Sequence, residues 1–218
     1  MEQFTMPDPL YIVLVLVTLS LAPFVAIMVT SFIKLVVVLS LVRNALGIQN
    51  IPPNMVINGL AIILTVYVMA PVGQQAYEAF RQAEIKERDL QSLVAAAGEA
   101  KEPIRAFLYK HSHARERAFF MRSAKALWPE ESAANLKEDD LMVLVPAFTV
   151  SELTAAFQIG FMLYLPFIAI DLVVSNILLA MGMMMVSPMT ISLPFKLLLF
   201  VLLDGWARLI HGLVLTYS

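Results

Sequence analysis

The sequence predicts an all-α, membrane-associated protein in which four long, kinked apolar helices flank a polar helical insert. Hydrophobic residues make up 60% of the 218 residues and charged residues 15%, and the mean hydropathy is +0.78. Soluble domains are roughly 45–50% apolar and about 25% charged. The chain therefore lacks the polar side chains that cover a soluble globule. The net charge of −2 excludes a strongly basic nucleic-acid surface, and the absence of cysteine excludes disulfides and thiolate sites.

The charged residues are concentrated in the middle of the chain. Of 32 in total, 23 lie between Glu78 and Asp140, as 12 acids and 11 bases. A nearly balanced run of this kind is typical of a solvated helical surface. The distribution predicts three parts: an apolar helical hairpin over 1–77, a mainly helical polar insert over 78–140, and two apolar helices over 141–218.

The first apolar helix is predicted over a run that is longer than one crossing. Residues 9–33 are uncharged, and a bilayer needs about 20 apolar residues in a helix. The apolar pattern continues to Arg43, so we expect the helix to tilt, to break near Pro23 or to leave the lipid in part. The pair Pro52-Pro53 then starts a second helix, expected over about 54–76.

The remaining elements follow from helix formers and breakers. The insert is expected to form helices over 82–100 and 104–127, followed by a surface loop over 129–141. A third apolar run over 141–185 contains prolines that predict kinks. A methionine-rich break at 181–189 precedes the last apolar helix, expected over 192–217.

The orientation is predicted from basic residues in short loops. Lys34 and Arg43 lie just before the first break, and such residues accumulate on the cytoplasmic side. The amino terminus and the insert are then expected on the other, periplasmic side. The chain opens without a positive n-region, so we expect the first helix to be retained and not cleaved as a signal peptide.

Seven charged residues of the apolar blocks are candidates for buried charge pairs or assembly contacts, because a charge in lipid costs several kcal/mol. They are Lys34, Arg43, Glu152, Asp171, Lys196, Asp204 and Arg208. Asp204 and Arg208 have the i, i+4 spacing and acid-first order that favour a helical ion pair, with Lys196 near the same face. Static bridges are the first interpretation. A proton or ion relay and a water-lined surface are the alternatives.

The methionine-rich break is the second candidate site. Met183, Met184 and Met185 are consecutive, and methionine side chains both fill irregular cores and adapt to varied partners. Non-helical backbone at membrane depth is tolerated only where protein buries it or where it lines a cavity. Core packing and a pore constriction are therefore both open interpretations.

The sequence offers no positive sign of an enzyme. It has no Walker A loop, no GxGxxG, no HExxH and no plausible Ser-His-Asp arrangement for a nucleophile and its base. His111 and His113 are two residues apart and do not share a helix face, which disfavours a metal site. We expect no catalytic residue, no cofactor and no metal.

Five segments carry a resemblance to a known family. They are LVRNALGIQNIPPN at 41–54, VMAPV at 68–72, PAFTVSELTAAFQIGF at 146–161, LPFIAIDLVVSNILLAMGMMM at 165–185 and SLPFKLLLFVLLDGW at 192–206. In this order they resemble the FliP/SctR family, which includes YscR and SpaP. The family forms the core of the export gate in flagellar and injectisome type III secretion. The insert matches less specifically.

The resemblance implies a non-enzymatic role in a channel that passes unfolded substrate proteins across the bacterial inner membrane. It implies a ring of about five copies within the basal body, completed by SctS-type and SctT-type subunits and joined by SctU-type and SctV-type components. In such a gate much of the apolar part is lifted out of the bilayer. Met183, Met184 and Met185 resemble the family's methionine gasket, which seals the lumen.

Two further expectations depend on the resemblance. Glu152 and Lys196 fall in matching motifs and have opposite charge, so we expect them to pair, within a chain or between subunits. The chain starts directly before its first apolar helix, which favours an injectisome member, with a role in virulence or symbiosis, over a flagellar one. The alternative function is a proton- or ion-coupled transporter with Glu152, Asp171 and Lys34 as a relay. The two halves show no convincing internal repeat of the kind transporters have.

Overall fold

The structure, a computed structural model, describes residues 9–48, 50–83, 96 and 98–218. Within these ranges the chain is helical and contains no strand, so the predicted all-α class is confirmed. The helices are α1 (Pro9–Met28), α2 (Phe32–Ala45), α3 (Asn54–Gln82), α5 (Glu102–His111), α6 (Ala114–Leu127), α7 (Glu130–Ala134), α8 (Leu141–Ala180), α9 (Pro188–Leu202) and α10 (Gly205–Leu215).

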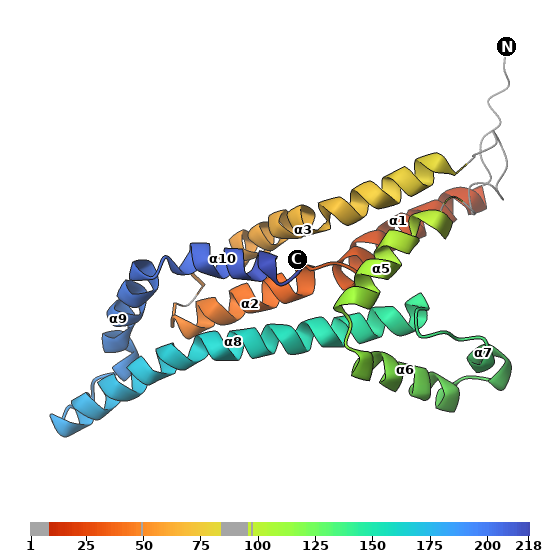
Figure 1. The fold of residues 1–218 in the computed structure, drawn as a ribbon. Coiled ribbons are helices and arrows are strands. Elements are labelled where there is room, and N and C mark those ends of the chain that lie inside the picture. The colour runs from red at the N-terminus through yellow and green to blue at the C-terminus, as the bar shows by residue number, and fades with distance from the viewer. Residues whose placement is uncertain (1–8, 49, 84–95, 97) are drawn as a thin grey trace, which may run out of the picture.

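Four candidate spans correspond to the predicted apolar helices. Helices α3 and α8 are each long and apolar enough to cross a membrane. Two bent pairs count as further spans if each pair crosses as one unit: the Leu19–Met28 part of α1 with α2, bent by 64°, and α9 with α10, bent by 60°. Figure 1 shows α2 lying between α3 and the long α8. Half of the residues of α2 are buried, which makes it the central helix of the apolar core.

The first break occurs at residues 29–31 and not near Pro23, which stays inside α1. The hydroxyl of Thr30 donates to the carbonyl of Ala26 at 2.7 Å. Such back-bonding competes with the backbone for the carbonyl and weakens the helix locally. Thr65 and Thr149 make the same bond inside α3 and α8, which stay helical, so the bond accompanies the break and does not by itself cause it.

The last apolar segment is two helices and not the single helix expected over 192–217. Asp204 adopts a left-handed conformation with φ of 51° between α9 and α10. A Cβ atom on Gly205 would lie 2.4 Å from the ring of Phe200, so the close approach at this bend requires glycine. Phe200 also packs edge-on against Trp206, at 5.4 Å between ring centroids. The left-handed residue, the glycine and the aromatic contact together fix the bend between α9 and α10.

The polar insert forms a second, smaller core against the first half of α8. Phe107 and Leu108 of α5 pack on Leu144 and Phe148 of α8. The single helix expected over 104–127 is instead split into α5 and α6, because the backbone is extended at Ser112.

Other expected boundaries also change. Helix α3 continues to Gln82, beyond the expected end near 76, and α8 runs unbroken through its two prolines. The expected loop over 129–141 contains the short α7. Most of the helix expected over 82–100 lies outside the described residues.

Candidate functional site

The methionine turn, residues 181–187, connects α8 to α9 through a defined helix cap. Gly182 has φ of +74° and donates its N–H to the carbonyl of Leu179 at 3.0 Å. The N–H of Met183 donates to the carbonyl of Leu178 at 2.9 Å. These two bonds form a Schellman motif, which ends a helix at a left-handed glycine. Pro188 then begins α9, where its fixed φ suits a first helical turn.

The three consecutive methionines of this turn point away from the protein's own core. Met183 is 47% exposed, Met184 82% and Met185 101%. A contiguous exposed apolar patch on a protein marks a contact with lipid, a partner or a ligand. The turn therefore presents flexible thioether side chains where α8 meets α9, without any charged residue among them.

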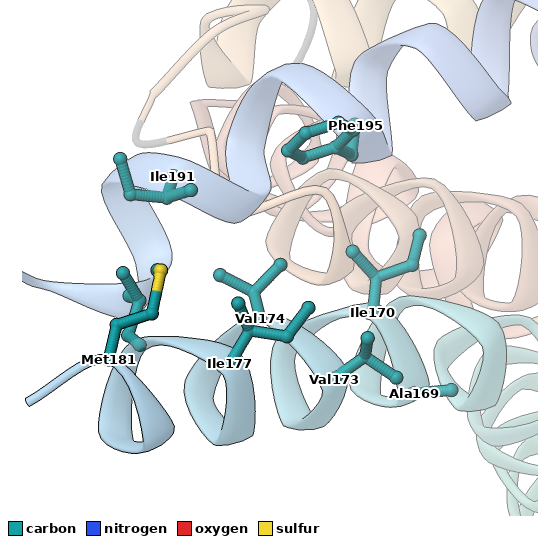
Figure 2. Close-up of a pocket in the computed structure, with 9 residues that line it drawn as sticks. Ala169, Ile170, Val173, Val174, Ile177, Met181, Ile191 and Phe195 are labelled. Carbon is teal, nitrogen blue, oxygen red and sulfur yellow. The ribbon is translucent and has the colours of Figure 1, made fainter.

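An apolar groove of about 530 Å³ lies between α8 and α9, beside the methionine turn. Figure 2 shows Ile191 and Phe195 of α9 facing Val174 and Ile177 of α8 and Met181 of the turn across it. Among the residues that the structure describes, no polar side chain lines the groove. Specific small-molecule sites combine apolar walls with a few placed polar groups, which this groove does not have.

One partly buried charge pair holds α9 against α8. Lys196 Nζ lies 2.6 Å from Asp171 Oδ2 and donates to the carbonyl of Ala45 at 3.3 Å. The hydroxyl of Ser192 donates to Asp171 Oδ1 at 2.6 Å. Ser192 and Lys196 are the buried residues of α9. This helix is therefore anchored to α8 and to the end of α2 by polar contacts.

A second pair, in which both side chains are buried, joins α2 to α8. Lys34 Nζ lies 3.0 Å from Glu152 Oε1, and their side chains are 5% and 3% exposed. The hydroxyl of Tyr217 donates to Glu152 Oε2, and Lys34 Nζ lies 3.8 Å from the centroid of the Tyr217 ring. Every charge in this cluster has a partner, which is the arrangement of a structural bridge and gives no support to the relay interpretation.

The chain does not form the expected pair between Glu152 and Lys196. Glu152 pairs instead with Lys34 of α2, and Lys196 pairs with Asp171 of α8. Glu152 and Asp171 are 19 residues apart on α8, which corresponds to about 28 Å along a helix. Lys196, bonded beside Asp171, is therefore far from Glu152 within one chain.

The other candidate charges do not form ion pairs among the described residues. The i, i+4 pairing of Asp204 with Arg208 is wrong because Asp204 lies at the bend and not within a helix, and both residues are exposed. Arg43 instead closes the turn between α2 and α3. Its guanidinium donates to the carbonyl of Pro52 at 3.2 Å and to Asn54 Oδ1 at 2.5 Å.

The part of the chain that the structure describes holds no group of three or more His, Asp or Glu residues able to bind a metal ion. Sequence reasoning missed Tyr217 and Ser192, which complete the two charge clusters. Ser192 lies one helical turn before Lys196, a spacing that could have indicated a shared partner. Tyr217 gave no local signal, because its partners are distant in sequence.

A family profile and several known proteins match nearly the whole chain. The FliP family profile matches residues 15–213. Yop proteins translocation protein R of Yersinia pestis is 58% identical over 213 residues, covering 98% of both chains. Hypersensitivity response secretion protein HrcR of Ralstonia nicotianae is 54% identical over 211 residues, covering 94% of this chain and 96% of the relative. Virulence protein YscR of Salmonella typhimurium is 48% identical over 223 residues, covering 98% and 100%.

Proposed function

Because the chain belongs to the FliP family, we propose that it is the pore-forming core subunit of a type III secretion export apparatus. It is a secretion-apparatus subunit of the inner membrane and a structural component, not an enzyme. In the proposed role it forms part of a gated channel through which unfolded proteins cross that membrane. Relatives named as translocation and secretion proteins support this role.

The observation that carries the proposal is the methionine turn. Three exposed methionines follow one another at a capped break between two long apolar helices. Copies arranged around an axis would bring these side chains together across the lumen. Thioether side chains close such a constriction without charge and adapt to the varied shapes of a passing chain.

The proposed assembly is a ring of about five copies with SctS-type and SctT-type subunits, beside SctU-type and SctV-type components. Large apolar side chains are exposed along α3 and α8, among them Ile63, Tyr67, Phe161 and Val173. Such surfaces need cover from lipid or neighbouring chains. We propose that the polar insert faces the periplasm, where its charges are solvated.

The test replaces the three turn methionines with alanine in the assembled complex. We expect Met183→Ala, Met184→Ala and Met185→Ala together to raise ion leak through the membrane, because the constriction loses its side chains. The matched control replaces Met55, Met142 and Met162, which are also exposed but lie on α3 and α8. The control should leave the leak unchanged.

Two outcomes would contradict the proposal. Equal leak from the turn and control variants would show that the turn does not seal the channel. Native mass spectrometry of the extracted chain, expressed with its partner subunits, should give a ring of about five copies. A monomer or dimer that ignores those subunits would overturn the assembly, whatever the leak assay shows.

A further inference from the structure

Four parts of the molecule meet at the side chain of Tyr217. Its ring stacks on Phe107 of α5, with centroids 6.1 Å apart and an interplanar angle of 19°. The same ring lies beneath Lys34 of α2, and its hydroxyl donates to Glu152 of α8. Tyr217 itself follows α10. One aromatic side chain therefore joins the polar insert to the buried charge pair of the apolar core.

His111 lies at the end of α5 against this junction. Its ring centroid is 5.1 Å from that of Tyr217 and 4.7 Å from that of Phe107. Burial lowers the pKa of His111 from 6.5 to about 4, with further lowering by the positive charges of Lys110 and Lys34. The imidazole is therefore neutral at pH 7, which suits its packing between aromatic rings.

A polar cavity of about 310 Å³ opens beside His111. The titratable groups that face it come from each neighbouring element: Lys34 from α2, Lys110 from α5, His113 from the turn before α6, and Glu152 from α8. Glu152 already accepts from Lys34 and Tyr217. The carboxylate is thus committed to other donors, while the cavity has the size and polarity to admit water.

We propose that His111 is a proton-binding site at the junction of the insert and the apolar core, and that its protonation releases α5 from Tyr217. An imidazolium here would be a third cation beside Lys34 and Lys110, in a half-buried position. The docked state therefore binds the proton more weakly than the released state does. This inference does not depend on the proposed channel.

The sign of the pH effect follows from this difference. The released histidine titrates near 6.5 and the docked one near 4. The neutral imidazole therefore favours packing of α5 on Tyr217 fully above about pH 6.5. This contribution is lost progressively as the pH falls to 4. Because the imidazole is half-buried and partly solvated, we expect the ratio of docked to released protein to fall by roughly ten-fold over this range.

The experiment measures a distance between α5 and α10 in the full chain held in lipid nanodiscs. Spin labels are attached at Ala106→Cys and Leu215→Cys, both exposed positions, in a protein without native cysteine. We expect one narrow distance at pH 7.5 and a longer, broader component that grows as the pH falls from 6.5 to 4. A second label pair, Met55→Cys and Met162→Cys, reports on the core and should not change.

Variants of the three histidines show which one causes the acid-induced change in distance. His111→Gln cannot bind a proton and should abolish the acid-induced component, whereas His113→Gln and His211→Gln should retain it. His111→Phe keeps the aromatic packing if the glutamine variant does not fold, and it should also stay docked at pH 4. An unchanged distance in the parent protein, a change that persists in both His111 variants, or a matching change in the core pair would overturn the proposal.

Discussion

The buried pair of Lys34 and Glu152 predicts a strongly non-additive response to substitution. Glu152→Leu leaves the Lys34 ammonium buried, with the face of the Tyr217 ring as its remaining partner. Breaking a buried pair by removing one member typically costs about 3–5 kcal/mol, because the other charge stays desolvated. Lys34→Met should cost less, about 2–3 kcal/mol, because the Tyr217 hydroxyl still donates to the carboxylate.

The double variant with Lys34→Met and Glu152→Leu should lie within about 2 kcal/mol of the parent protein, and that residual loss comes from the Tyr217 hydroxyl, which has lost its acceptor. Both charges are then absent, and apolar side chains of similar volume replace them. The assay is the free energy of unfolding in mixed micelles, followed by the fluorescence of Trp128 and Trp206. A double variant whose loss equals the sum of the two single losses would refute the reasoning, because it would show that the pair has no coupling.

The pair of Asp171 and Lys196 tests whether burial sets the cost of breaking an ion pair in this protein. The Asp171 side chain is 35% exposed, so water still solvates it when Lys196 is removed. Lys196→Met should therefore destabilise the protein by only about 1–2 kcal/mol. Equal losses at the two pairs would show that burial does not set the cost of breaking them.

Two further predictions concern glycines. Gly182→Ala should destabilise the cap of α8 by about 1–2 kcal/mol through its left-handed backbone alone, since a Cβ there meets no atom within 4 Å. Gly182→Asn should cost less in the same unfolding assay, and equal losses would contradict a backbone origin. Gly160→Ala places a Cβ 2.3 Å from Leu41 Cδ1 and should cost about 1–3 kcal/mol by overpacking. Leu41→Ala should recover part of that loss, and a fully additive double variant would rule out the clash.

Local hydrophobicity predicted the helices well, and long-range contacts explain what it missed. The apolar runs require helices because backbone groups in lipid must bond within their own segment. The break at residues 29–31 contains no proline or glycine, whereas Pro23, the conspicuous breaker, stays inside α1. The split of the insert helix at Ser112 is stabilised by an N–H donated from His113 to Ser151 of α8. That contact is 38 residues away in sequence.

The partners in one of the two ion pairs could have been predicted from the sequence, and those in the other could not. Asp171 and Lys196 lie almost equally far before and after Met184, so a hairpin centred on the methionine turn places them opposite each other. This partner could have been predicted from the hairpin alone. The partner of Glu152 could not, because Lys34 is 118 residues away and reaches it only when α2 packs between α3 and α8.

The burial pattern of α9 connects these contacts to the proposed role. The two residues that α9 buries are polar, whereas large apolar side chains such as Phe195, Leu198 and Val201 are exposed. A single chain therefore fixes the direction of α9 by hydrogen bonds and an ion pair, and leaves its apolar surface for lipid or other subunits to cover. Buried polar contacts of this kind stabilise little compared with apolar packing, but they specify one geometry. In α9 that geometry sets where the methionine turn points, so in the proposed ring the contacts of Ser192 and Lys196 with Asp171 would align the turns of its copies.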